Sequence, residues 1–171
     1  FLVLAHVELH QTDPARFLSD AQVLNVRSVA EKTACQRAEK MGRAADLVFE
    51  GSDVFARSKE EYLTKIVEEL FDNALKFSVA GTPVRVGVRR ESNHAVVRIA
   101  DRGRGMKAEH IAEVGAYMQF ERRFYEQQGS GLGLSICKRL AELHGGSLSI
   151  SSEVGVGTAV DVRLPACASG G

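Results

Sequence analysis

The stretch ELFDNALKFS (residues 69–78) combines two rows of side chains that separate from each other if the backbone is helical. At about 3.6 residues per turn, Glu69, Asn73 and Lys76 share one helix face. Apolar residues form a second row, which predicts the face that packs into a core: Leu63, Ile66, Leu70, Ala74 and Phe77. We therefore expect a helix that ends near Ser78 and presents a carboxylate, an amide and an amine away from its core side.

The polar row suits a site for a magnesium nucleotide. The amide oxygen of Asn73 is the kind of ligand that a hard cation prefers, and the ammonium of Lys76 offers charge to phosphate oxygens. Glu69, one turn before the amide, can orient or deprotonate an attacking group. The alternative is a solvated helix face on which Asp72 and Lys76 form an ordinary i,i+4 ion pair. This stretch alone favours the solvated face, and two further stretches reverse that preference.

The composition describes a single folded domain. The chain has 171 residues, of which 44% are hydrophobic and 26% are charged, so a core is available and disorder is not indicated. Its 22 basic and 22 acidic side chains balance, which argues against a nucleic-acid partner. Cys35, Cys137 and Cys167 lack the spacing of a disulfide or zinc framework and fit reduced thiols in the cytoplasm. The apolar opening at 1–5 is too short to span a bilayer, so we expect no membrane contact by this domain.

Periodicity and chain breakers predict the remaining elements. Helical spacing in residues 1–13 indicates the last part of a helix that begins upstream. Capping-box patterns at Ser28 and Ser58 predict the starts of two helices, and the predicted helical ranges are 29–41, 58–78 and 107–114. Alternating apolar residues predict strands at 21–26, 47–49, 84–89, 95–100, 148–150 and 160–164, with a hairpin turn over 91–94. We expect residues 21–165 to form the main domain and 166–171 to be a frayed tail.

A second chemical stretch, DRGRG (residues 101–105), directly follows the predicted hairpin. Gly103 and Gly105 allow positive φ angles and close approach of the backbone to a ligand. Asp101, held at the end of a strand, can accept hydrogen bonds, and an adenine amino group is a suitable donor. The alternatives are a plain glycine turn and, more remotely, an arginine-glycine contact with RNA.

A third stretch, GSGLGL (residues 129–134), runs directly into a predicted helix that ends at a glycine C-cap, His144-Gly145-Gly146. Backbone amides of a glycine loop at a helix N-terminus form a site for phosphate. The common nucleotide motifs do not explain it, because the chain has no Gly-Lys pair and Leu134 stands where GxGxxG needs glycine. The charged and aromatic segment before it, 117–128, is predicted to be a mobile lid.

Together these stretches resemble the ATP-binding domain of sensor histidine kinases, within the larger ATPase group that includes DNA gyrase and the mismatch-repair clamps. Residues 69–78 resemble its asparagine box, 101–105 its first glycine box and 129–134 its second. The glycine C-cap and Gly157-Thr158 follow downstream. The resemblance covers residues 21–165 and implies an α/β fold, a two-layer sandwich of a mixed, mostly antiparallel sheet packed on helices.

The resemblance also implies a role for each matching residue. Asn73 would ligate Mg²⁺, Lys76 would contact phosphate and Asp101 would read adenine. Glu69 would be the catalytic base or polariser, at a position that is often asparagine in histidine kinases. The full set of implied ATP contacts is Asn73, Lys76, Asp101, Gly103, Gly105, Gly129, Gly131, Leu132, Gly133, Leu134 and Thr158.

The function implied by the resemblance is transfer of the γ-phosphoryl group of ATP to a histidine on an upstream helical domain. Residues 1–13 would be the end of that dimerisation and phosphotransfer hairpin, and no histidine of this chain has the acidic, basic and proline neighbours of the acceptor. The implied partners are the upstream domain and a response-regulator receiver domain, with a cytoplasmic location and a homodimeric full-length protein. A non-catalytic nucleotide-sensing module and an anti-sigma-type serine kinase stay open as alternatives.

Overall fold

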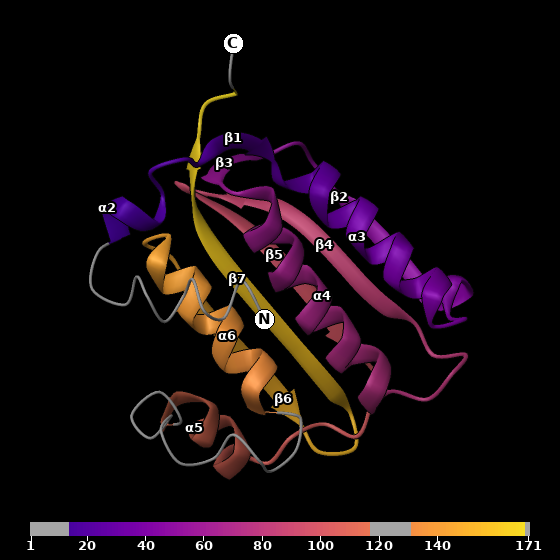
Figure 1. Ribbon diagram of the computed structural model, residues 1–171. Helices are drawn as coiled ribbons and strands as arrows, with labels where there is room; N and C mark the ends of the chain where they lie inside the picture. The colour runs from indigo at the N-terminus through magenta and orange to yellow at the C-terminus, as the bar shows by residue number, and fades with distance from the viewer. Residues whose placement is uncertain (1–13, 117–130, 170–171) are drawn as a thin grey trace.

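The computed structural model of the chain describes residues 14–116 and 131–169, which form a layer of strands and a layer of helices (Figure 1). The helices are α2 (Pro14–Phe17), α3 (Val26–Lys40), α4 (Glu60–Phe77), α5 (Ala108–Ala116) and α6 (Gly131–Leu143), with a short 3-10 helix over Ala44–Asp46. The strands are β1 (Gln22–Asn25), β2 (Leu47–Gly51), β3 (Phe55–Ser58), β4 (Val84–Glu91), β5 (His94–Asp101), β6 (Ser147–Glu153) and β7 (Gly157–Cys167). Within these described ranges, no helix has the length and apolar character needed to cross a bilayer.

The strands form a seven-stranded sheet in the order β1-β3-β7-β5-β4-β2, and β6 pairs with β7 off this path. β2 lies parallel to β4, and the other pairings are antiparallel. The helices α3, α4 and α6 cover one face of the sheet (Figure 1), so the predicted two-layer sandwich with a mixed, mostly antiparallel sheet is confirmed. The predicted hairpin of β4 and β5 is confirmed as well, and its pairing reaches Glu91 and His94 at the turn.

The apolar row of α4 packs into the core as predicted. Leu63 and Ile66 are fully buried. On β4 the buried side chains alternate with more exposed ones, the buried ones being Val84, Val86 and Val88. Burying one such aliphatic side chain contributes about 1.5–3 kcal/mol, so several of them together fix the rotation of α4 about its own axis. That rotation sets the direction of the polar row.

Both predicted capping boxes are wrong. α3 begins earlier, at Val26, because the side chain of Asn25 accepts a hydrogen bond from the N–H of Ser28 at 3.3 Å. Ser58 is the last residue of β3, a strand that periodicity did not predict, and Lys59 at the N-cap of α4 makes no side-chain cap bond. β3 forms because it pairs with β1 and β7, which lie far from it in the sequence.

The C-terminal segment also differs from the prediction of a frayed tail over 166–171. β7 continues to Cys167, because its last two residues pair with the first two residues of β3. The helix predicted within 1–13 and the lid predicted over 117–128 lie outside the described residues.

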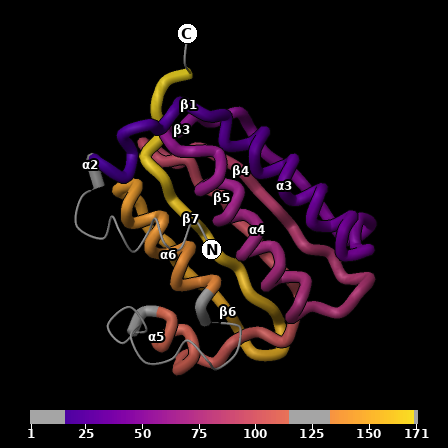
Figure 2. The backbone as a smooth tube through the Cα atoms, in the orientation of Figure 1, coloured from indigo at the N-terminus to yellow at the C-terminus, as the bar shows by residue number. Residues whose placement is uncertain are grey.

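The segment that enters the domain is held at one end of the helical layer, where α2 lies beside the end of α6 (Figure 2). Phe17 is fully buried and stacks on Tyr62 of α4, with ring centroids 4.5 Å apart and an interplanar angle of 8°. His144, just after α6, meets Phe17 edge-on at 5.2 Å, and its Nε2 lies 2.9 Å from the hydroxyl of Ser58. Burial lowers the pKa of His144. One aromatic side chain thus joins α2 to both α4 and α6.

Candidate functional site

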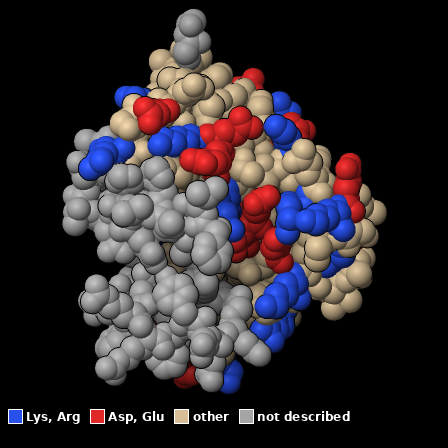
Figure 3. Space-filling view, viewed as in Figure 1, with Lys and Arg blue, Asp and Glu red and all other residues tan. Residues whose placement is uncertain are grey.

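The polar row of α4 contains the first predicted site residues. Glu69 and Asn73 are half-buried, and Lys76 is exposed at the end of the helix. The alternative ion pair with Lys76 is wrong, because Asp72 accepts a hydrogen bond from Nε of Arg37 on α3 at 2.9 Å. Basic and acidic side chains interleave on the face of the molecule that Figure 3 shows, over α3 and α4.

Glu69 brings the first stretch against the third. A Cβ atom built on Gly133 of α6 would lie 2.4 Å from Oε2 of Glu69, a separation that real Cβ atoms do not adopt. The present position of the Glu69 carboxylate against α6 therefore depends on glycine. Lys65, one turn earlier on α4, forms an ion pair with the same carboxylate. Gly133 of the third stretch thus leaves room for the carboxylate of Glu69 in the first stretch.

The second stretch closes on the C-terminal end of α4. The N–H of Arg104 donates to the carbonyl oxygen of Phe77 at 3.2 Å, and a Cβ atom on Gly103 would lie 2.2 Å from that oxygen. The guanidinium of Arg104 lies 4.5 Å from the centre of the Phe77 ring, and the ammonium of Lys76 lies 5.3 Å from it. Two cations therefore flank one aromatic ring where the first and second stretches meet.

Gly105 fastens the second stretch to the turn between β6 and β7. Its φ angle is 70°, and a Cβ atom there would lie 2.0 Å from the carbonyl oxygen of Glu153. The N–H of Gly155 donates to the carbonyl oxygen of Arg104 at 2.9 Å. The loop is therefore held from both sides, by α4 and by this turn.

Asp101 lies at the end of β5, opposite Thr158 of β7. Its Oδ1 accepts a hydrogen bond from the N–H of Gly103 at 2.7 Å, and the N–H of Thr158 also interacts with the carboxyl group. Burial raises the pKa of Asp101, against the opposing effect of these two backbone groups. A carboxyl group has several acceptor positions, so this one can still receive a hydrogen bond from a ligand.

The amide of Asn73 has a buried nitrogen, Nδ2, with no hydrogen-bond partner among the described residues. A buried polar atom without a partner costs about 1–3 kcal/mol, which makes such a group a candidate for ligand binding. The Oδ1 of the same amide is a ligand of the type that Mg²⁺ accepts.

A metal cluster does not compete with this interpretation. In residues 14–116 and 131–169, no group of three or more His, Cys, Asp or Glu side chains could hold a metal ion. Mg²⁺ fits a site with few protein ligands, because it keeps several waters and completes its shell with substrate phosphates. The side chains present therefore fit a magnesium nucleotide.

α6 begins inside the third stretch, at Gly131. Its first turn includes Leu132, Gly133 and Leu134, whereas Gly129 lies outside the described residues. The side chain of Leu134 packs in the core, so a contact between this residue and a ligand would use its backbone. The first four N–H groups of a helix lack partners within the helix, so this turn can supply donors to phosphate.

Known proteins are similar to this chain in sequence and in fold. The family of histidine kinase-, DNA gyrase B- and HSP90-like ATPases matches residues 58–168. The chain belongs to this family. The mycobacterial sensor histidine kinase MprB has a similar solved structure, with a TM-score of 0.65 and 30% identity, covering 85% of this chain and 97% of that one.

Curated relatives of this ATPase domain are sensor kinases. An uncharacterized sensor-like histidine kinase of Rhizobium meliloti (strain 1021) is 39% identical over 108 residues, which is 62% of this chain and 21% of that protein. Sensor histidine kinase YvrG of Bacillus subtilis (strain 168) is 32% identical over 123 residues, which is 66% of this chain and 21% of that protein. The chain spans about a fifth of the length of these relatives. Its fold and family are those of the ATP-binding catalytic domain of sensor histidine kinases.

Ser152 is a residue of the ATPase domain that the sequence analysis did not single out. Its hydroxyl lies within hydrogen-bond distance of Met106, Gly157 and Thr158. The sequence contains one signal for it, because Ser152 continues the alternation of Leu148 and Ile150 toward the inner face of the sheet. Neighbouring serines of β6 lack this position.

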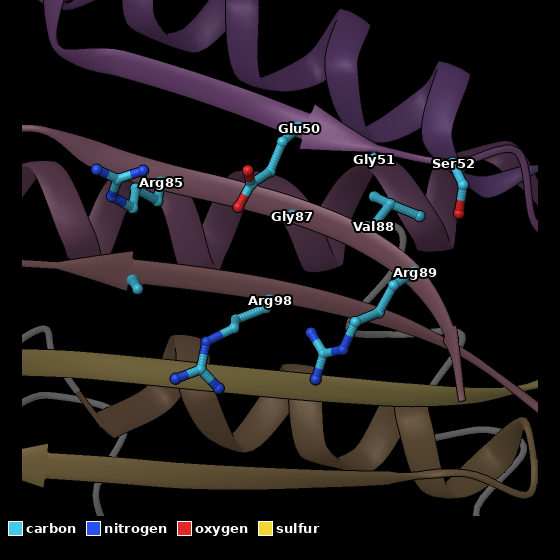
Figure 4. A pocket seen from close by; sticks show the side chains of 9 residues that line it. Glu50, Gly51, Ser52, Arg85, Gly87, Val88, Arg89 and Arg98 are labelled. Carbon is cyan, nitrogen blue, oxygen red and sulfur yellow. The ribbon is translucent and has the colours of Figure 1, made fainter. Parts of the chain in front are cut away.

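A separate hollow of about 410 Å³ lies on the face of the sheet opposite the helices (Figure 4). Arg98 at this hollow pairs with Asp161 at 2.8 Å, and Arg89 donates to Glu91 at 2.8 Å. Gly87 contributes no side chain to its floor. No predicted ATP contact among the described residues lines this hollow, so it is distinct from the ATPase site.

Proposed function

We propose that this ATPase domain binds Mg²⁺-ATP and transfers the γ-phosphoryl group to a histidine on an upstream helical domain. The carrying observation is the position of the Asn73 amide, whose buried Nδ2 has no hydrogen-bond partner among the described residues. It lies on α4 between Glu69, which contacts Gly133, and Phe77, which receives the loop at Gly103. The amide thus lies on α4 between two segments. One is the first turn of α6 (residues 131–134), here called the phosphate-type turn, and the other is the loop of residues 101–105, here called the adenine-type loop.

Each end of the nucleotide has suitable groups in this arrangement. Asn73 would hold Mg²⁺ through its amide oxygen, and the bound ion would neutralise charge on the phosphates. Lys76 and the backbone of the α6 turn over 131–134, preceded by Gly129, would contact the phosphates. Asp101 and Thr158 would read the adenine, while Gly103 and Gly105 let the loop approach it.

Glu69 is proposed as the catalytic carboxylate. Its ion pair with Lys65 and its contact with Gly133 hold it beside the phosphate-type turn. From there it could orient an attacking imidazole or accept its proton while the nitrogen forms its bond to phosphorus. The Pγ–O bond breaks in the same transfer, and ADP leaves.

The partners follow from this reaction. An upstream dimerisation and phosphotransfer domain would supply the acceptor histidine, and the receiver domain of a response regulator would take the phosphoryl group from it. Homodimerisation of the full-length protein and a cytoplasmic location of this domain belong to the same proposal. The relatives support it because their names describe sensor histidine kinases.

The test is a labelling experiment with γ-labelled ATP. The chain alone should stay unlabelled, because none of its histidines has the acceptor sequence, and addition of the upstream helical domain should produce an acid-labile phosphoryl group on that domain. Acid-stable label on the chain alone would instead support the serine-kinase alternative. ATP binding without transfer to the upstream domain would leave only nucleotide sensing.

A further inference from the structure

The hydroxyl of Ser152 ties together three backbone segments beside Asp101. It accepts a hydrogen bond from the N–H of Met106 at 2.8 Å. It lies 2.9 Å from the carbonyl oxygen of Gly157 and 2.8 Å from the hydroxyl of Thr158. The loop of the second stretch, the end of β6 and the start of β7 therefore share one side-chain oxygen.

The number of hydrogens at this oxygen decides the direction of each bond. A serine hydroxyl has one hydrogen to donate and two lone pairs to receive. The carbonyl oxygen of Gly157 has no hydrogen, so the contact with it uses the hydrogen of Ser152. The N–H of Met106 occupies one lone pair, and the second lone pair then receives the hydrogen of Thr158. All contacts are satisfied only in this arrangement.

In this arrangement the single hydroxyl hydrogen of Thr158 is donated to Ser152. The Thr158 hydroxyl can then only accept a hydrogen bond from any other group. Thr158 faces Asp101 in the register of β5 and β7. The ionised carboxylate is also an acceptor without a hydrogen. The two side chains therefore present acceptors to a ligand and no hydroxyl donor.

We infer that Ser152 is a positioning residue that fixes Thr158 as a hydrogen-bond acceptor and so selects a purine that carries an amino group at its 6-position. The inference rests on the proposed function, because it assumes that the base lies at Asp101 and Thr158. The matching ligand class is a 6-aminopurine nucleotide. A purine without this amino group offers no hydrogen to either side chain.

The test compares ATP with purine riboside 5′-triphosphate, which differs from ATP by the missing 6-amino group. Dissociation constants of both are measured by calorimetry for the parent chain and for Ser152→Ala. Removal of the serine hydroxyl frees the hydrogen of Thr158, which can then turn toward a ring nitrogen of the base. The preference for ATP should fall by about 2- to 10-fold, the range of one neutral hydrogen bond.

The matched control is Ser151→Ala, which removes an exposed hydroxyl from the adjacent position of β6. It should leave both dissociation constants unchanged. Equal weakening of the two nucleotides by Ser152→Ala would overturn the inference, because a merely structural hydroxyl would act on both alike. The proposed function would survive that result, whereas a parent chain that binds neither nucleotide would overturn the proposed function itself.

A second variant tests the polarity of Thr158 even if Ser152→Ala does not fold. Thr158→Val removes the hydroxyl and keeps a β-branched side chain. If Thr158 accepts from the amino group, ATP weakens and purine riboside 5′-triphosphate does not. Equal weakening of both nucleotides means that Thr158 donates, which contradicts the inference.

Discussion

The guanidinium of Arg43 donates from Nη1 to the carbonyl oxygen of Leu75 at 2.9 Å. Its Nη2 donates to the hydroxyl of Ser78 at 3.2 Å and to the carbonyl oxygen of Val79 at 3.0 Å. The same guanidinium forms an ion pair with Asp46. A cation at this place satisfies carbonyl groups that the last turn of a helix leaves free. Arg43 therefore closes the C-terminal end of α4.

We expect Arg43→Met to lower the free energy of unfolding by about 1.5–3 kcal/mol, the contribution of a hydrogen bond from a charged group. At about 2–4 °C per kcal/mol, the melting temperature should fall by several degrees. The control is Arg85→Met, which removes an exposed arginine of β4 and should change stability by less than about 0.5 kcal/mol. Equal melting shifts in the two variants would contradict the role of Arg43.

Asn73→Ala tests the metal ligand. The variant should lose Mg²⁺-dependent ATP binding and keep its melting temperature, because the amide makes no hydrogen bond through Nδ2 that folding would lose. Calorimetric titrations with ATP in Mg²⁺ and in EDTA measure this directly. Asn93→Ala, in the exposed turn between β4 and β5, is the matched control. Unchanged affinity for Mg²⁺-ATP in Asn73→Ala would remove this residue from the site.

Asp101→Ala should weaken ATP binding by roughly 10- to 150-fold, because a hydrogen bond to a charged group contributes about 1.5–3 kcal/mol. GTP, which presents a carbonyl oxygen where adenine has an amino group, should bind poorly to both proteins. The dissociation constants of the two nucleotides for parent and variant measure the effect. If the ratio between ATP and GTP stays the same, Asp101 is only a turn residue.

The raised pKa of Asp101 gives ATP affinity a pH dependence of known sign. Its protonation begins at a higher pH than for an ordinary aspartate, so ATP affinity should decrease as the pH is lowered toward that range. Asp101→Asn should lack this part of the dependence. For stability the sign is opposite, because a folded-state pKa above the unfolded value favours folding at low pH and opposes it as the pH rises. Calorimetric titrations with ATP between about pH 7 and pH 5 compare the affinity of the parent chain with that of Asp101→Asn.

Gly133→Ala should impair phosphoryl transfer more than folding. Its added methyl group meets the end of the Glu69 side chain, which is flexible and can move away from the phosphate-type turn. We expect slower transfer to the upstream domain with a small change in melting temperature. Gly87→Ala is the matched control, because a Cβ atom there meets nothing within 4 Å. Full transfer activity in Gly133→Ala would show that the position of Glu69 is unimportant.

The parts of the fold that the sequence predicted are those with a local cause. The apolar row of α4 and the alternation in β4 can be recognised from residues a few positions apart. β3 could not, because its four residues become a strand through pairing with β1 and β7. The cap of α3 was misplaced for a related reason, since Asn25 and Ser28 both have side chains suited to capping and backbone geometry selects between them.

For the candidate site, the order of the motifs in the sequence predicted which residues would lie near one another. The contacts between them depend on how the helices and strands pack, which the motifs do not contain. Glu69 was expected near a nucleotide, but its contact with Gly133 depends on how α4 packs on α6. The bond from Arg104 to the carbonyl of Phe77 likewise joins segments separated by the whole hairpin of β4 and β5. Ser152 had no motif to mark it, because its proposed role depends on the direction of its hydrogen bond with Thr158.

The stacking of Phe17 has a mechanical consequence for the domain. Phe17 touches Tyr62 in the first turn of α4 and His144 just after the last turn of α6. We expect a force on the segment that contains Phe17 to act on the start of α4 and on the end of α6 at the same time, and to be transmitted along both helices. Glu69 lies further along α4 and Gly133 further along α6, at the point where the two helices touch. A force at Phe17 would therefore shift the carboxylate of Glu69 relative to the phosphate-type turn.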